Sequence, residues 1–153
     1  MKKEIMIART FDASRERVWK AWTDAKELAQ WWGPSGVTIP ISEVDLRVGG
    51  ALYIVMLAGK EMGPLAGQKW PMKGVFKEIV ELEKLVFSSD ALDETGNVLL
   101  SGKTTVTFED EGGKTKLTVI ASATGDAPGT EFMLQGMKPG WNQQLDKLGK
   151  VLA

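Results

Sequence analysis

The sequence predicts an α+β fold in which a seven-stranded, curved antiparallel sheet wraps around a long C-terminal helix, in the order β-α-α-β6-α. One alternating strand is followed at once by two short helical segments. Residues 37–123 then form β-rich segments separated by turn signals, and residues 130–153 return to helical periodicity. We expect a single domain over residues 1–153, a length that buries one core.

The first segment, EIMIARTF, has the periodicity of a strand. Ile5, Ile7 and Phe11 share one face, and polar residues occupy much of the other. Arg9 breaks the pattern because it lies on the apolar face. We therefore expect a first strand that turns one charged side chain inward.

Two short helices should follow. Ser14 is a candidate N-cap for the segment that carries Trp22, and Asp24 with Glu27 forms a capping-box pattern for the next. Gly33 and Pro34 end that second helix.

The second helix ends in two adjacent tryptophans. Neighbouring helix positions point about 100° apart, so Trp31 and Trp32 cannot share one environment. We expect Trp31 in the core and Trp32 facing a cavity or its mouth.

The β-rich region should form six strands joined in sequence. Its strand segments are VTIPISEVDL, ALYIVML, MKGVFKEIV, KLVFSSDAL, KTTVTFED and TKLTVIASA, the last two joined by the tight-turn sequence EGG. Short connections between consecutive strands favour an antiparallel meander. The connection over residues 59–69 is long and rich in Gly and Pro, which makes it a candidate gate.

The C-terminal segment has one apolar stripe, formed by Trp141, Leu145, Leu148 and Leu152 at helical spacing. Gly136, Pro139 and Gly140 should kink or restart the helix before this stripe.

Composition excludes several functions. The net charge is −1, from 19 Lys+Arg and 20 Asp+Glu, which makes nucleic acid an unfavourable partner. The chain has no His and no Cys, so the commonest general base, thiolate nucleophiles and the usual zinc ligands are missing. We expect no metal, no cofactor, no recognisable catalytic constellation and, without a long apolar run or a leader, a cytoplasmic protein that does not insert into membranes.

A curved sheet that wraps a helix can enclose a small-molecule cavity, because the two need not touch everywhere. Aromatic residues and flexible methionines suit such a lining, although they also suit an ordinary core. The candidate lining residues are Trp32, Tyr53, Met56, Met72, Phe76, Phe87, Met133, Met137 and Trp141.

Three charged residues share the parity of apolar strand faces: Arg9, Glu43 and Glu78. Because a buried charge needs a partner, we expect Arg9 to pair with Glu43 or Asp45. Such groups form either a structural ion pair or a polar floor for a ligand.

Four segments together resemble the bacterial single-domain members of the Hsp90-ATPase-activator-homologue family: RTFDASRERVWKAWTDAKELAQWWGP, VDLRVGG, PMKGVFKEIVELEKLVFSS and GWNQQLDKLGKVL. This family is part of the START-like, Bet v 1-like helix-grip superfamily. The resemblance implies the helix-grip fold and allows a role in stress response. The co-chaperone that names the family carries a further N-terminal domain for Hsp90 binding, whereas this chain begins at the first helix-grip strand.

The leading functional expectation is the binding of a small, mostly hydrophobic ligand between the sheet and the C-terminal helix. One alternative is an enzyme similar to the superfamily's cyclases and isomerases, in which Glu78 would move a proton. The other is a chaperone-associated protein-binding module. The protein could act as a monomer or as a homodimer.

Overall fold

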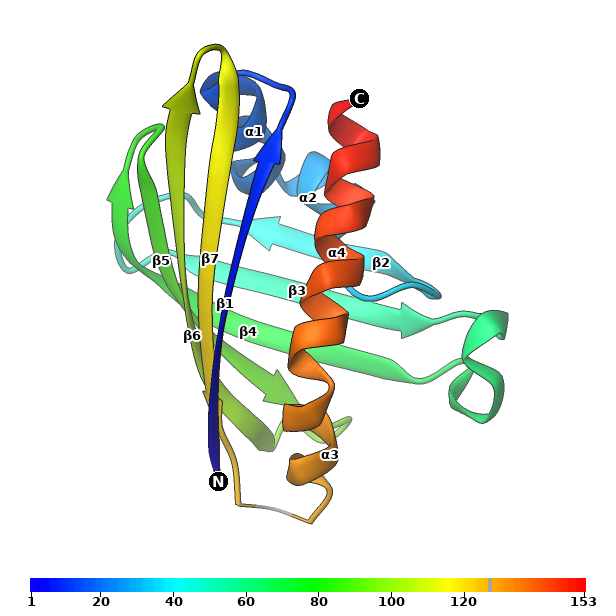
Figure 1. The fold of residues 1–153 in the computed structure, drawn as a ribbon. Coiled ribbons are helices and arrows are strands. Elements are labelled where there is room, and N and C mark those ends of the chain that lie inside the picture. The colour runs from blue at the N-terminus through cyan, green and yellow to red at the C-terminus, as the bar shows by residue number, and fades with distance from the viewer. Residues whose placement is uncertain (127) are drawn as a thin grey trace.

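The computed structural model describes residues 1–126 and 128–153, and its elements follow the predicted order (Figure 1). The strands are β1 (Lys2–Phe11), β2 (Val37–Val44), β3 (Ala51–Ala58), β4 (Lys69–Val80), β5 (Lys84–Leu92), β6 (Val98–Glu111) and β7 (Lys114–Thr124). The helices are α1 (Arg15–Thr23), α2 (Ala25–Trp31), the 3-10 helix η1 (Lys60–Leu65), α3 (Thr130–Gln135) and α4 (Met137–Leu152). None of the described helices is both long enough and apolar enough to span a bilayer.

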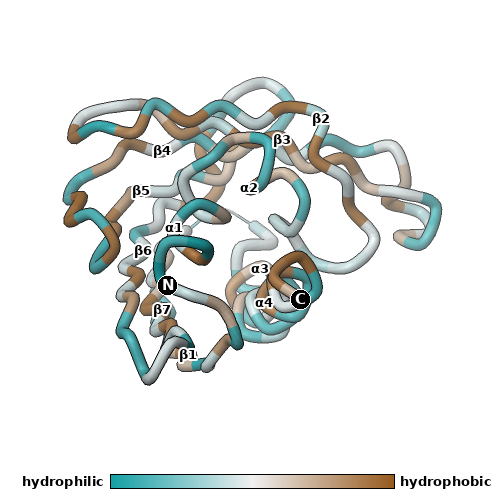
Figure 2. Tube along the Cα trace, turned by 90° about the horizontal axis from the view of Figure 1, so that it is seen from above, coloured by the Kyte–Doolittle hydropathy of each residue, from teal (hydrophilic) through white to brown (hydrophobic). Residues whose placement is uncertain are grey.

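All seven strands form one antiparallel sheet in the order β1-β7-β6-β5-β4-β3-β2. Strands β2 to β7 form the predicted meander, and β1 pairs with β7, so β1 and β2 are the two edges of the sheet. Seen from above, the sheet curves around α4, and α1 and α2 lie over the space between them (Figure 2). The predicted fold class is therefore confirmed.

Two register shifts decide which strand residues face α4. Thr38 lies opposite Leu57, but Ile41 lies opposite Val55, so β2 contains one residue more than β3 over this stretch. Such a bulge turns all later side chains to the opposite face of the sheet. A second shift, between Phe76 and Glu78 of β4, has the same effect.

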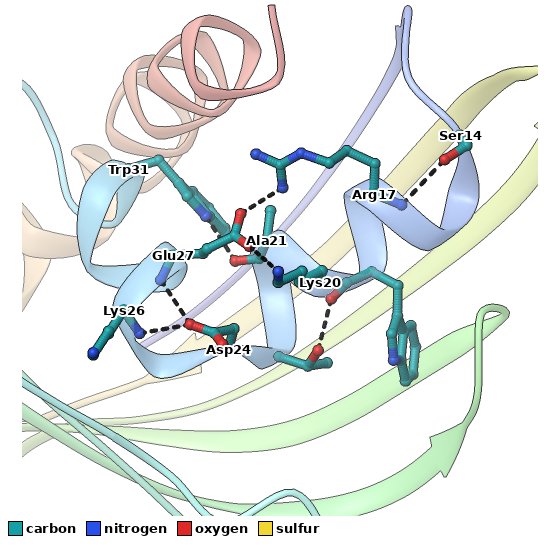
Figure 3. A network of polar contacts seen from close by, with 10 residues as sticks. Ser14, Arg17, Lys20, Ala21, Asp24, Lys26, Glu27 and Trp31 are labelled. Atoms are coloured by element: carbon teal, nitrogen blue, oxygen red, sulfur yellow. Dashed lines mark hydrogen bonds and ion pairs between the residues drawn. The ribbon is translucent and has the colours of Figure 1, made fainter.

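The helices α1 and α2 begin where the sequence predicts and are joined by polar contacts (Figure 3). The Ser14 hydroxyl accepts a hydrogen bond from the Arg17 amide at 3.2 Å. The Asp24 carboxylate accepts from the amides of Lys26 and Glu27 at 3.0 and 3.1 Å. An ion pair between Arg17 and Glu27 then connects the two helices.

The C-terminal helix restarts at Gly136, as predicted. The amide of Gly136 bonds back to the carbonyls of Phe132 and Met133, and α4 begins at the next residue. Pro139 and Gly140 lie in the first turn of α4, where a missing amide costs no helical hydrogen bond.

The long connection at residues 59–69 forms η1 at the tip of the β3–β4 hairpin. The Gly59 amide bonds to the carbonyl of Gly36 at 2.8 Å, and Met62 packs where a Cβ on Gly36 would lie. This tip is thus anchored to the turn that follows Trp32.

Candidate ligand-binding site

The space between the sheet and α4 holds a cluster of aromatic rings. Trp22 from α1 lies 4.6 Å from Trp31 and 6.3 Å from Trp32, measured between ring centroids. Trp32 also lies 5.6 Å from Trp141 of α4 and 6.4 Å from Phe87 of β5. Trp32 therefore contacts rings from α1, α2, the sheet and α4.

The two adjacent tryptophans have different environments. Trp31 is fully buried, and its indole N–H donates to the carbonyl of Ala21 at 2.9 Å, which confirms its expected place in the core (Figure 3). Trp32 follows the last helical residue with an extended backbone, so its ring leaves the direction of α2. It is buried between β5 and α4.

Two candidate methionines lie on the paired strands β3 and β4, and two lie at the beginning of the C-terminal helical region. Met72 of β4 is buried, whereas Met56 of β3 and Met133 and Met137 of the helical segments are half-buried. Met137 packs against both hydrophobic clusters of the structure, and Met133 packs against the smaller one. We call these four methionines and the half-buried Trp141 the seam.

The interior next to the seam is filled by side chains in this conformation. Phe76 and Phe87 face it from β4 and β5 with exposures of 2% each, and Trp32 is 7% exposed. The two clearest hollows among the described residues, of about 390 and 370 Å³, lie elsewhere. A guest would therefore have to move seam side chains to enter.

Tyr53, Glu43 and Glu78 do not face this interior. Glu43 and Tyr53 lie opposite each other on the outer face, and Tyr53 lines the larger outer hollow. The prediction that the two glutamates share the inward parity of their neighbours is wrong, because the bulges in β2 and β4 turn them outward. Glu78 is half-exposed and forms an ion pair with Lys84 at 3.4 Å.

Arg9 faces α4 and has other partners than predicted. Its guanidinium pairs with Asp146 and donates to the backbone and side-chain oxygens of Asn142 at 3.1 and 3.0 Å. Pairing with Glu43 or Asp45 is wrong because β1 and β2 lie at opposite edges of the sheet. Arg9 thus ties the edge strand to the middle of α4.

Sequence reasoning missed a set of polar contacts between α4 and the chain after Trp32. Gln144 accepts from the amide of Gly33 at 2.6 Å, and Gln143 accepts from the amide of Ser35 at 3.0 Å. We call Gln143, Gln144 and Lys147 the α4 clamp. Its only signal in the sequence is that Gln144 and Lys147 flank the apolar stripe of α4.

Lys147 is the charged member of the clamp. Its Nζ donates to the carbonyls of Trp32 and Gly33 at 3.1 and 3.2 Å and approaches that of Pro34 at 3.5 Å. Burial lowers the pKa of the Lys147 amine from its ordinary value. The ammonium group thus supplies hydrogen-bond donors to backbone carbonyls at and just after the C-terminal end of α2.

Comparisons with known proteins agree with this architecture. Protein CV1439 from Chromobacterium violaceum is 27% identical, with a TM-score of 0.79 over 97% of this chain and 96% of its own. A protein from Arthrobacter aurescens is 26% identical, with a TM-score of 0.84 over 97% of this chain and 85% of its own. The AHSA1 protein SPO3351 from Silicibacter pomeroyi, at 22% identity and a TM-score of 0.74 over 97% of this chain and 96% of its own, shares the fold.

A search among curated proteins gives no match. The sequence model of one family, described as Activator of Hsp90 ATPase homolog 1-like protein, matches residues 12–153. This match covers everything from the end of β1 to the end of α4, including the clamp, the aromatic cluster and nearly all of the sheet. The chain belongs to the family of Activator of Hsp90 ATPase homolog 1-like proteins.

Proposed function

We propose that the protein binds a small, mostly apolar molecule between the sheet and α4, entering through the seam. The observation that carries this proposal is the seam itself, in which half-buried Met56, Met137 and Trp141 pack against the core cluster that contains Trp32. The Trp141 ring also lies 5.6 Å from the Trp32 ring. Flexible thioethers can repack around a guest at low cost, unlike the branched side chains that fill most cores. The fold of the family is also compatible with such a site.

The rest of α4 supports entry at the seam. Asn142, Asp146 and the α4 clamp attach the middle of the helix to β1 and to residues 33–35. Before Asn142, the contacts of the helix with the sheet are apolar and include Met137 and Trp141. Apolar contacts are non-directional, so side chains there can shift without breaking hydrogen bonds.

A neutral apolar dye, N-phenyl-1-naphthylamine, tests the proposal. Its fluorescence should rise on binding, and tryptophan emission should fall as the dye approaches Trp32 and Trp141. Met137→Glu should weaken binding about tenfold or more, because it places an unpaired charge at the entrance.

Met6→Glu is the matched control. Met6 lies on the outer face of β1 and is 67% exposed, so this variant adds the same charge away from the seam. It should leave the dye affinity unchanged, as should Tyr53→Phe. Equal affinities for the two glutamate variants, with both proteins folded, would rule out the seam as the binding site.

A further inference from the structure

The indole N–H of Trp22 is buried without a hydrogen-bond partner. Trp22 is 3% exposed, and among residues 1–126 and 128–153 its Nε1 is the one fully buried side-chain nitrogen or oxygen without a partner. Two other tryptophans show the usual solution, since Trp31 donates to Ala21 and Trp70 donates to Gln68. A buried donor that stays unpaired is costly and calls for an explanation.

The position of Trp22 suggests that explanation. Its ring lies nearly parallel to that of Trp141, with an interplanar angle of 17° and 6.2 Å between centroids. Trp32 contacts both of these rings. Trp22 is thus next to Trp141, which belongs to the seam, and to Trp32, which contacts Trp141. A guest that moved these two rings would reach the N–H of Trp22.

The charges around this donor determine which kind of acceptor fits. The inward positions of β3, β4 and β5 carry no charged residue among the described part of the chain. Two cations near this region already have partners: Arg9 of β1 is engaged by Asp146 and Asn142, and Lys147 of α4 is engaged by backbone carbonyls. A carboxylate or phosphate would therefore enter without a counter-ion, which is strongly unfavourable.

We propose that the ligand is an uncharged, largely apolar molecule with one oxygen acceptor, such as a ketone or an ester carbonyl, and that the Trp22 N–H donates to this oxygen. This inference rests on the proposed function, because it assigns a ligand class to the same site. The alternative is that, without a ligand, the Trp22 N–H donates to the π face of the Trp31 ring, which lies at 63° to the Trp22 ring. A donor already satisfied in this way would not distinguish between ligands.

Three naphthalene probes of similar size test the inference. The first, 2-acetylnaphthalene, has a carbonyl; 2-isopropenylnaphthalene replaces its oxygen with a CH₂ group; and 2-naphthoate carries a charge. Their affinities are compared in the wild type and in Trp22→Phe. The affinity ratio of ketone to alkene should fall about three- to tenfold in the variant, as expected for one lost neutral hydrogen bond. The naphthoate should bind the wild type about tenfold or more weakly than the ketone.

A second measurement does not depend on the variant's folding. The indole ¹H–¹⁵N resonance of Trp22 in the wild type should move downfield with the ketone and not with the alkene. The resonance of Trp31 is the internal reference, because its N–H is already bonded to Ala21.

The outcomes separate the two proposals. If both neutral probes bind at the seam but the ratio and the Trp22 resonance do not respond to the carbonyl, the acceptor inference is wrong and the binding site stands. Tighter binding of the naphthoate than of the ketone also overturns the inference. If no naphthalene probe binds, and Met137→Glu leaves the affinity for N-phenyl-1-naphthylamine unchanged, the proposed function fails. The inference then fails with it.

Discussion

Lys147 is a half-buried cation with no carboxylate partner among residues 1–126 and 128–153. Its Nζ instead donates to carbonyls at the end of α2, next to the residue that closes the interior. Hydrogen bonds to carbonyls recover part of the hydration that burial removes, while the burial itself lowers the pKa of the Lys147 amine. The α4 clamp therefore holds the backbone of Trp32 in place by partly burying the charge of Lys147, which is energetically unfavourable.

The burial of Lys147 predicts that the stability of the protein depends on pH. The folded-state pKa of Lys147 is lower than the unfolded one, so the unfolded chain binds more protons between the two values. The free energy of unfolding of the wild type, measured relative to that of Lys147→Met, should therefore increase with pH. This increase should occur between the pKa of Lys147 in the folded protein and the ordinary lysine value of about 10.4. Urea unfolding of both proteins at about pH 7 and about pH 10.4 measures this difference.

Lys150→Met serves as the control, since Lys150 is an exposed lysine on the same helix. Its stability difference from the wild type should not depend on pH in this way. A difference between the wild type and Lys147→Met that is constant with pH would show that Lys147 is as well solvated in the folded as in the unfolded protein.

At the scale of elements, features that depend on adjacent residues are predicted well from the sequence. Features that depend on how distant strands pair are predicted less well. The caps at Ser14 and Asp24 and the break at Gly136 each depend on a few adjacent residues, and all three are confirmed. The second helix ends at Trp31, one residue earlier than the stop predicted from Gly33 and Pro34. The inward parity of Glu43 and Glu78 is wrong because a bulge depends on how two strands align. Pro40 gave one hint, since proline within a sheet favours edges and bulges.

The same limit applies to contacts between distant elements. Nothing near Arg9 in the sequence indicates that Asp146, 137 residues later, lies beside it. The partner predicted on β2 requires that β1 and β2 be neighbours, whereas the strand order puts them at opposite edges of the open sheet. The positions of the helix-borne and inward-facing aromatic residues were accordingly predicted better than the positions of the polar candidates.

The cap of α2 gives a prediction at this scale. Asp24 accepts two backbone amides that the helix leaves unpaired, so Asp24→Ala should lower the free energy of unfolding by about 0.5–2 kcal/mol. Asp12→Ala is the control, because Asp12 is exposed and its carboxylate makes no hydrogen bond or ion pair among the described residues. Equal losses in urea unfolding for both variants would contradict a capping role.

At the scale of the whole molecule, α4 is attached unevenly. Residues 142–147 form hydrogen bonds or ion pairs with β1 on one side and with residues 32–35 on the other. Residues 132–141 contact the sheet and the short helices through apolar side chains. Phe132 is 81% exposed, so α3 is only partly packed. Because of this asymmetry, we expect any opening of the interior at the beginning of the helix.

Hydrogen exchange followed by mass spectrometry can detect this opening, because local stability follows local contacts. Peptides covering residues 132–141 should exchange faster than those covering 142–149. N-phenyl-1-naphthylamine should slow exchange in the first set far more than in the second, since the dye would fill the seam and restrain Met137 and Trp141. Met137→Glu should remove this protection, whereas Met6→Glu should keep it. If the dye instead protected residues 142–149 or the outer strands first, the helix would open from its other end or the dye would bind outside the interior, and entry at the seam would be wrong.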